Sequence, residues 1–517
     1  MNGANAMIRT LVRCDVRTCF MNPGTSEMHF VAALDDVTEM RSVLALFEGV
    51  ATGAADGYAR MAGRPAATLL HLGPGLGNGL ANLHNARKAF TPLVNIVGDH
   101  ATYHKQYDAQ LESDIETVAR NVSSFVRWSA KPEEVGADAA DAVAAALGPP
   151  GQVATLVLPA DVSWSAGGQV ADARAPHAPS PVDDATIGAV AAALRSGEPA
   201  ALFVGGRACR GELLDTAAAI AAATGAKLLC ETFPARLERG AGRPPVERLA
   251  YLAELAALQL DGLAHLVLVD AKSPVSFFAY PDKASDLVPD GTRVHVLSRP
   301  ADDVAGALSG LADALGVEPS SAPRQSAARP DRPTGALTAE AACAALGALL
   351  PEGAIVSDEG NTAGLFAAGA SAGAPPHDWL TLTGGAIGQG LPVAVGAAVA
   401  CPDRPVVALE ADGSALYTLQ SWWTMAREGL DVTTVLLNNR SYAILNMELA
   451  RVGAAGGERA RAMLDLSRPD LDFVSLARGM GLSAARATTA DELVTELERA
   501  LATPGPSVVE AMVPPLL

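Results

Sequence analysis

Val406-Val407-Ala408-Leu409-Glu410-Ala411-Asp412-Gly413-Ser414 is an apolar run that stops at an acidic residue, and Leu436-Leu437-Asn438-Asn439-Arg440-Ser441 also ends in a polar turn. The residues between them favour a helix over 415–429 and a second strand over 432–437. In a parallel sheet, such a strand–helix–strand unit puts both strand ends at one edge, where ligands bind. We therefore expect Asp412 and Asn439 to be neighbours.

This edge has the chemistry of a site for a hydrated cation and phosphate. One carboxylate and one amide oxygen suit a Mg²⁺ that keeps water and completes its shell with phosphate oxygens. Gly413 and Ser414, which open the next helix, can offer backbone N–H groups to the same phosphates. Taken alone, Asp-Gly-Ser after a strand is more often a turn with a helix cap. The Asn438-Asn439 pair at the next strand end favours the cation site.

The composition is that of a large globular protein. A chain of 517 residues is too long for one core and suggests about three domains. Two stretches rich in Pro, Ala and Ser, Gly167 to Asp184 and Glu318 to Gly335, resemble linkers. We therefore predict domains at 1–168, 185–318 and 335–517. Each alternates β-rich runs with Ala-rich helical runs, which predicts an α/β fold of three doubly wound parallel-sheet domains.

Charge and patterning exclude two kinds of partner. The formal net charge of −19, without a basic run, argues against nucleic acid and anionic membranes. No apolar stretch is long enough to span a membrane, and Arg9, Arg13 and Asp15 fall where a signal peptide needs its apolar core. The six cysteines form neither a Cys-x-x-Cys pair nor a disulfide-like pattern. We expect a cytoplasmic protein with buried free thiols.

Two further patterns lie in the first segment. Glu48 stands between a β-rich run and a helix that carries small residues, where it can also simply complement the helix dipole. After a strand over 67–70, the glycine-rich residues 71–79 predict a loop, followed by a helix over 80–88. Such loops bind phosphate in general. This one lacks the Lys-Ser/Thr of a P-loop and the spacing of a dinucleotide fingerprint.

Three of these motifs together resemble the thiamine-diphosphate-dependent enzymes of the benzoylformate decarboxylase and acetolactate synthase type. They are Glu48, the Gly73-Pro74-Gly75 stretch with Asn78, and Asp412-Gly413 followed by Asn438-Asn439. The resemblance covers essentially the whole chain. It implies a pyrimidine-binding domain, a central Rossmann-like domain and a diphosphate-binding domain, in that order.

The resemblance also implies the cofactor contacts. Glu48 would bond N1′ of the aminopyrimidine, while Asp412, the Asn439 side chain and the Ser441 carbonyl would hold Mg²⁺ or Ca²⁺. The Gly385 carbonyl would accept from the 4′-amino group, and Ile387 would bend the cofactor. Ala411 replaces the first glycine of the family signature but leaves the metal-binding atoms in place. The residues implied to bind the cofactor are Glu48, Gly73, Asn78, Asn361, Thr362, Gly385, Ile387, Asp412, Gly413, Ser414, Asn439 and Tyr442.

His71 bears on the type of reaction. A lone histidine at a strand end is often only a hydrogen-bonded structural residue. Benzoylformate decarboxylase has a histidine at the corresponding place, however, and a histidine here could pass a proton to or from a bound intermediate. The resemblance therefore makes Glu48, His71 and Thr25 the candidate catalytic residues. The implied substrate pocket is lined by Thr25, His71, Leu111, Phe278 and Leu445. Phe277, Phe278 and Tyr280 make one wall aromatic, which suits an apolar substrate group.

The implied activity is non-oxidative decarboxylation of a 2-oxo acid, with carboligation of the enamine intermediate to an acceptor such as an aldehyde. One alternative is a dedicated acetolactate synthase-type transferase that forms acyloins. Another is a non-catalytic nucleotide-binding homologue, against which the retained Glu48 argues. FAD is not expected, because the central domain of the family often binds nothing, although the glycine-rich residues 205–211 could be taken for a nucleotide loop. The resemblance also implies a homodimer or homotetramer whose sites are shared between chains.

Overall fold

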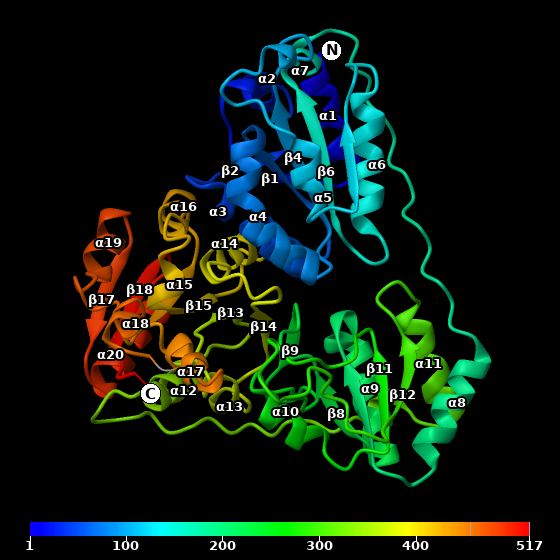
Figure 1. Cartoon of the computed structure of the whole chain (residues 1–517), viewed down its shortest axis with the longest axis vertical. Helices are drawn as coiled ribbons and strands as arrows, with labels where there is room; N and C mark the ends of the chain where they lie inside the picture. The colour runs from blue at the N-terminus through cyan, green and yellow to red at the C-terminus, as the bar shows by residue number, and fades with distance from the viewer. Residues whose placement is uncertain (455, 516–517) are drawn as a thin grey trace.

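The computed structural model describes residues 1–454 and 456–515. They form three sheets flanked by helices, and Figure 1 shows the N-terminal (blue to cyan), central (green) and C-terminal (yellow to red) parts as three lobes. The predicted α/β fold class with parallel-dominated sheets is confirmed. The domain boundaries at 168/185 and 318/335 remain a prediction. No helix within the described ranges is long and apolar enough to cross a membrane.

The N-terminal sheet is wholly parallel, with strand order β2-β1-β3-β4-β6-β5. Its middle strands are buried along their whole length and mostly apolar, as expected when helices cover both faces. The elements are β1 (Thr18–Asn22), β2 (Arg41–Leu44), β3 (Ala66–Leu70), β4 (Leu93–Asp99), β5 (Phe125–Trp128), β6 (Val153–Pro159), α1 (Gly3–Arg13), α2 (Met28–Ala33), α3 (Glu48–Ala62), α4 (Leu72–Lys88), α5 (Ile115–Arg120), α6 (Val135–Leu147) and α7 (Ala160–Trp164).

The central sheet is also parallel, with strand order β10-β8-β7-β11-β12. An extended segment leads to it from the N-terminal lobe along the outside of the molecule (Figure 1). The elements are β7 (Ala200–Val204), β8 (Lys227–Cys230), β10 (Glu247–Arg248), β11 (His265–Val269), β12 (Arg293–Ser298), α8 (Asp184–Arg195), α9 (Gly211–Thr224), α10 (Ala253–Leu260) and α11 (Val304–Leu315).

The C-terminal sheet has the order β17-β18-β16-β15-β13-β14-β9, and all its pairs are parallel except the last. β9 (Leu237–Arg239) comes from the central part of the chain. The other elements are β13 (Ile355–Glu359), β14 (His377–Thr381), β15 (Val406–Ala411), β16 (Val432–Asn438), β17 (Ser483–Ala487), β18 (Ser507–Met512), α12 (Ala339–Leu349), α13 (Ala367–Ala370), α14 (Gly390–Ala400), α15 (Asp412–Ala415), α16 (Ser421–Glu428), α17 (Ala443–Arg451), α18 (Glu458–Ala462), α19 (Phe473–Gly479) and α20 (Ala490–Ala502).

Helices α3 and α14 join the N-terminal and C-terminal lobes at very short range. A Cβ atom on Gly396 would lie 1.9 Å from the Ala54 carbonyl oxygen, and one on Gly57 would lie 2.1 Å from the Val393 carbonyl oxygen. Such close backbone approach needs residues without side chains. The apolar face around this contact belongs to one buried cluster that includes residues of both lobes.

Two sequence predictions about local structure were wrong. The glycine-rich residues 72–79 are not a loop, because α4 already begins at Leu72. Their glycines allow α4 to lie against α3, since a Cβ on Gly79 would be 2.9 Å from Thr52 Cγ2. The helix predicted over 415–429 is broken into α15 and α16, which flank a short turn.

Candidate functional site

Glu48 is the first residue of α3 and lies just beyond the end of β2. Its side chain is largely buried, and its Oε2 accepts a hydrogen bond of 3.0 Å from Asn78 Nδ2 on α4. Gly75, on the same helix, faces the other oxygen, because a Cβ there would lie 3.1 Å from Glu48 Oε1. Two predicted cofactor residues, Glu48 and Asn78, are thus brought together, with the carboxylate held by α4.

His71 makes a side-chain contact with a carboxyl group that the sequence did not reveal. Its Nδ1 lies 2.8 Å from Glu27 Oε2, which also accepts from the Gly24 backbone N–H at 2.7 Å. Glu27 is almost fully buried, and burial raises the pKa of its carboxyl group, while the neighbouring His71 opposes the rise. Glycine is required at both flanks, because a Cβ on Gly24 would meet the His71 ring and one on Gly98 would meet Glu27 Oε1.

Sequence reasoning missed Glu27 as a functional candidate. The available signal was the Gly24-Thr25-Ser26-Glu27 turn, whose last residue, Glu27, caps the turn by accepting a hydrogen bond from Gly24 N. A capping glutamate is normally solvent-exposed and structural. Its contact with His71 depends on the pairing of β1 with β3, which local sequence does not show. Thr25 lies in the same turn and is exposed.

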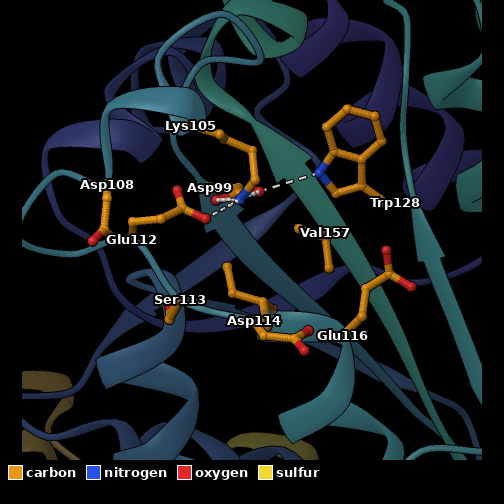
Figure 2. Close-up of a pocket in the computed structure, with 10 residues that line it drawn as sticks. Asp99, Lys105, Asp108, Glu112, Ser113, Asp114, Glu116, Trp128 and Val157 are labelled. Carbon is orange, nitrogen blue, oxygen red and sulfur yellow. Dashed lines mark hydrogen bonds and ion pairs between the residues drawn. The ribbon is translucent and has the colours of Figure 1, made fainter.

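Gly73 contacts a neighbouring loop residue, and Leu111 lies on the surface. Gly73 packs so closely on Ser113 that a Cβ would lie 1.9 Å from its Oγ. Leu111 is 38% exposed. Ser113 also lines a cavity of about 450 Å³ at the carboxyl end of the N-terminal sheet. Figure 2 shows Lys105 in this cavity, contacting Asp99 (2.9 Å) and Glu112 (2.7 Å). Five of the ten residues that line this cavity are acidic, and none of the ten is a predicted catalytic residue.

At the edge of the C-terminal sheet, Asp412 and Asn439 are neighbours, as predicted. β15 pairs with β16 up to Ala411 and Leu437, and the next residues form the two polar turns. Asp412 Oδ2 accepts from the Arg440 backbone N–H at 2.6 Å, and Asn439 Oδ1 accepts from the Ser441 N–H at 3.0 Å. Burial raises the pKa of Asp412 to about 6, and the surrounding backbone N–H groups only partly oppose this rise.

This donor set fits a hydrated hard cation. A buried carboxylate with a raised pKa is stabilised by a nearby positive charge. Within the described residues, no group of three or more His, Cys, Asp and Glu side chains is placed to hold a metal ion. A cation at Asp412 would therefore rely on amide and main-chain oxygens and on water, which Mg²⁺ accepts.

The diphosphate residues predicted from the sequence gather beside Asp412. Asn361, with a left-handed φ of 47°, donates from Nδ2 to Ser414 Oγ at 3.4 Å. Ser414 Oγ itself donates to Glu410, which is buried at the end of β15. Thr362 is buried after β13. Tyr442 packs over Gly413, since a Cβ there would lie 2.5 Å from the Tyr442 ring.

Gly385 and Ile387 lie in the turn between β14 and α14, and Gly385 has a left-handed φ of 73°. The Phe277 ring from the central part packs directly on Gly385, where a Cβ would be 2.3 Å from Cζ. Phe278 contacts Phe277 with ring centroids 4.9 Å apart and is 54% exposed. Leu445, on α17, is 45% exposed. The predicted aromatic wall therefore stands beside Gly385.

The glycine-rich turn after β7 is filled by acidic side chains of its own domain. Asp270 Oδ2 accepts from the Arg207 N–H at 2.6 Å, and a Cβ on Gly206 would lie 2.6 Å from the same oxygen. Glu231 is packed on Gly205, and burial raises the pKa of this carboxyl group to about 7. The carboxyl groups of Glu231 and Asp270 therefore lie directly against the two glycines of this turn.

Comparison with known proteins bears on this arrangement. The family model "Thiamine pyrophosphate enzyme, N-terminal TPP binding domain" matches residues 1–120, and "Thiamine pyrophosphate enzyme, C-terminal TPP binding domain" matches residues 358–511. A protein of Mycobacterium tuberculosis (strain ATCC 25618 / H37Rv), named "Putative acetolactate synthase large subunit IlvX", is 61% identical over the full length of both chains.

Two other similar proteins are named as decarboxylases. Benzoylformate decarboxylase of Pseudomonas aeruginosa is 30% identical over 98% of each chain. The solved structure of a thiamine diphosphate-dependent 4-hydroxybenzoylformate decarboxylase from Rhodococcus jostii RHA1 has a TM-score of 0.85 over 99% of each chain, at 23% identity. At that identity the structural likeness shows the fold alone.

The fold of three parallel-dominated sheets and these matches define a class, the thiamine pyrophosphate (thiamine diphosphate) enzymes, and the chain belongs to that family. It is an enzyme of the decarboxylase or acetolactate synthase-like group.

Proposed function

We propose that this enzyme binds thiamine diphosphate with Mg²⁺ and decarboxylates a 2-oxo acid without oxidation, with carboligation of the product fragment to an acceptor. The observation that carries the proposal is the pair of polar strand ends. Glu48, held by Asn78, stands at one sheet edge, and Asp412 with Asn439 stands at another. The aromatic base of such a cofactor needs a carboxylate that shares a proton with it, and the diphosphate needs a carboxylate that holds its cation.

The residues of this chain have distinct tasks in the proposal. Thiamine diphosphate, when bound, supplies a nucleophilic carbon that takes up the electron pair left behind by CO₂. Glu48 shares a proton with the aminopyrimidine ring, and Asn78 orients its carboxylate. Asp412, the Asn439 side chain and the Ser441 carbonyl hold the cation. The remaining predicted contacts are made by Gly73, Asn361, Thr362, Gly385, Ile387, Gly413, Ser414 and Tyr442.

His71 and Glu27 are proposed to handle the proton of product formation. A buried carboxylate bonded to Nδ1 fixes the orientation of the imidazole ring and leaves Nε2 as the nitrogen for proton exchange. This arrangement resembles an acid–base residue with an orienting partner. Thr25 lies in the same turn as Glu27 and is proposed to contact the substrate.

The proposed substrate is a 2-oxo acid with an apolar group. Phe277 and Phe278 lie beside Gly385, and Leu111 and Leu445 are exposed. These side chains would pack against an apolar substituent of the substrate. The acidic side chains at Gly205 and Gly206 support the further proposal that the central part binds neither FAD nor another nucleotide.

A dedicated acetolactate synthase-type transferase is the second candidate. It is favoured by the 61% identical relative with that name. It is also favoured by the closing segment of the central part, where Phe277, Phe278 and Tyr280 stand and no histidine is present between residues 273 and 280. With no histidine in this segment, the chain would offer fewer proton donors for aldehyde formation, which would favour transfer to an acceptor carbonyl.

The test is cofactor content together with substrate turnover. Purified protein should yield thiamine diphosphate, detected as thiochrome fluorescence, and should release CO₂ from at least one member of a panel of aliphatic and aromatic 2-oxo acids. Analysis of the organic product separates aldehyde from acyloin and so separates the two candidates. A protein that neither binds added thiamine diphosphate with Mg²⁺ nor turns over any panel member would refute the proposal.

A further inference from the structure

The turn that carries Gly385 and Ile387 is held by two asparagines of the N-terminal part. Asn82 and Asn85 lie three residues apart on α4 and therefore share one face of the helix. They are 2% and 0% exposed. No task was assigned to either residue from the sequence.

Asn82 bridges two segments that are far apart in the sequence. Its Nδ2 donates to the Gly49 carbonyl at 2.8 Å and to the Gly388 carbonyl at 3.1 Å. Gly49 follows Glu48 in the first turn of α3, and Gly388 follows Ile387. One amide group therefore ties the start of the Glu48 helix to the turn of the C-terminal lobe.

Asn85 holds the same turn through the backbone of Ala386. Its Nδ2 donates to the Ala386 carbonyl at 2.8 Å, and its Oδ1 accepts from the Ala386 N–H at 3.2 Å. Its Nδ2 also donates to Asn82 Oδ1 at 3.0 Å, and its own carbonyl accepts from Thr383 Oγ1 at 2.8 Å. Ala386, which lies between Gly385 and Ile387, is held on both its backbone groups.

The surrounding packing allows the turn little freedom. A Cβ on Gly384 would lie 2.4 Å from Asn85 Oδ1, and one on Gly53 would lie 2.9 Å from Asn82 Nδ2. Each donor and acceptor of the two buried amides is used, and removing a partner would leave backbone groups of the turn without hydrogen bonds. Neutral amides achieve this without burying a charge.

We propose that Asn82 and Asn85 are positioning residues that fix the turn 384–388 and the start of α3, and so set where Gly385, Ile387 and Glu48 meet the cofactor. The inference rests on the proposed function for the roles of those three residues. The two asparagines act through backbone groups of other residues.

The test is hydrogen–deuterium exchange of the full-length protein without cofactor, followed by mass spectrometry of peptides that cover 383–390. Asn85→Leu keeps the approximate shape of the side chain and removes its hydrogen bonds. We expect at least tenfold faster exchange at Ala386, whose N–H bonds to Asn85. Asn82→Leu should loosen 386–388 and the first turn of α3, and both variants should bind thiamine diphosphate at least tenfold more weakly by calorimetry.

Asn95→Leu is the matched control. Asn95 is equally buried in the same lobe, but its amide bonds to Thr68 and Thr155 inside the N-terminal sheet. This variant should lower the melting temperature while leaving exchange at 383–390 and cofactor affinity unchanged. If either leucine substitution prevents folding, Thr383→Val removes the bond to the Asn85 carbonyl from the other side and should accelerate exchange at 383–386 more mildly.

Unchanged exchange in 383–390 in the folded Asn82 and Asn85 variants, or equal acceleration in Asn95→Leu, would overturn the positioning role. Because the exchange experiment contains no cofactor, its result stands apart from the proposed function. Failure of the wild-type protein to bind thiamine diphosphate would refute the proposed function. The exchange result would still report whether Asn82 and Asn85 hold the turn 384–388.

Discussion

Glu48 is the residue whose replacement tests the proposed chemistry most directly. Glu48→Gln preserves shape and the contact with Asn78 but cannot share a proton with the cofactor. We expect the fold and most cofactor affinity to remain while turnover falls by about 10²–10⁴-fold. Steady-state CO₂ release measures this, with exposed Glu39→Gln as the control. Turnover above about a tenth of the wild-type rate would contradict the role.

His71 should affect the choice of product rather than the first chemical step. In His71→Ala, aldehyde release should fall more than carboligation, because protonation is slowed and the unprotonated species meets the acceptor instead. Glu27→Gln should shift the ratio in the same direction but less, since it removes only the orienting carboxylate. The measurement is the ratio of aldehyde to carboligation product, determined by chromatography. An equal fall of both products would show that His71 acts earlier or only holds structure.

His377 should make the folded state sensitive to mild acid. Burial lowers its pKa from 6.5 to about 4, so the unfolded state binds the proton first as the pH falls. The stability is complete above about pH 6.5 and is lost progressively towards pH 4. Between pH 7.5 and 5.5 the loss should be about 1 kcal/mol.

The measurement for His377 is the difference in unfolding midpoint between pH 7.5 and 5.5. In His377→Gln this difference should shrink relative to the wild type, because the glutamine does not titrate. A variant with the same pH dependence as the wild type would mean that other groups carry the acid sensitivity.

The candidate site residues whose positions could be predicted from the sequence lie at or just after strand ends. Asp412, Asn439 and Glu48 follow apolar runs, and their positions depend only on the local pattern and on the geometry of parallel sheets. Glu27, Asn82 and Asn85 could not be read, because their contacts depend on which strands pair and on how α4 meets the other lobe. A buried asparagine on a helix has no local signature of its partner.

At the level of elements, the α3–α14 contact should be intolerant of a single methyl group. Gly396→Ala places its Cβ against the Ala54 carbonyl, so the two helices must separate. We expect a loss of about 3 kcal/mol in stability, near the upper end for overpacking. The midpoint of urea unfolding measures it.

Gly188→Ala is the matched control for this helix substitution. Gly188 lies inside α8, and a Cβ there would meet nothing within 4 Å. It should leave stability unchanged or raise it by about 0.5–1 kcal/mol, because alanine favours helix. A comparable loss in both variants would indicate that helix propensity, and not the backbone contact, is being measured.

The elements themselves were predicted unevenly. Strands with strong β-rich runs, such as β3, β15 and β16, were found at or near their observed bounds. The start of α4 was misplaced because its glycines read as a loop, whereas here they serve close packing. β9 was missed because three residues carry no periodic signal, and its partner β14 lies in another part of the chain.

For the whole molecule we expect active sites built from two chains. Large apolar side chains are exposed at or near the ends of the functional strands, among them Leu46, Leu365 and Tyr417, and a second copy would cover them. Inactive Glu48→Gln and inactive Asp412→Ala subunits, after complete exchange, should regain roughly a quarter of wild-type activity. Half of the dimers are then hybrids, and each hybrid has one intact site.

The mixing experiment needs two controls. Each variant alone should stay inactive, and tagged subunits should show that exchange has occurred. Activity that fails to return despite proven exchange would show that Glu48 and Asp412 of the same chain serve one site.

The strand β9 has a consequence for how the chain is made. Leu237, Glu238 and Arg239 pair with Trp379, Asp378 and His377, and the Arg239 guanidinium lies over the Trp379 ring. On the ribosome, the nascent segment 237–239 therefore has to wait without its partner strand until residues 377–381 have been translated. A gene split at the 318/335 boundary would distribute one sheet over two polypeptides, so a C-terminal lobe made on its own would lack its edge strand β9.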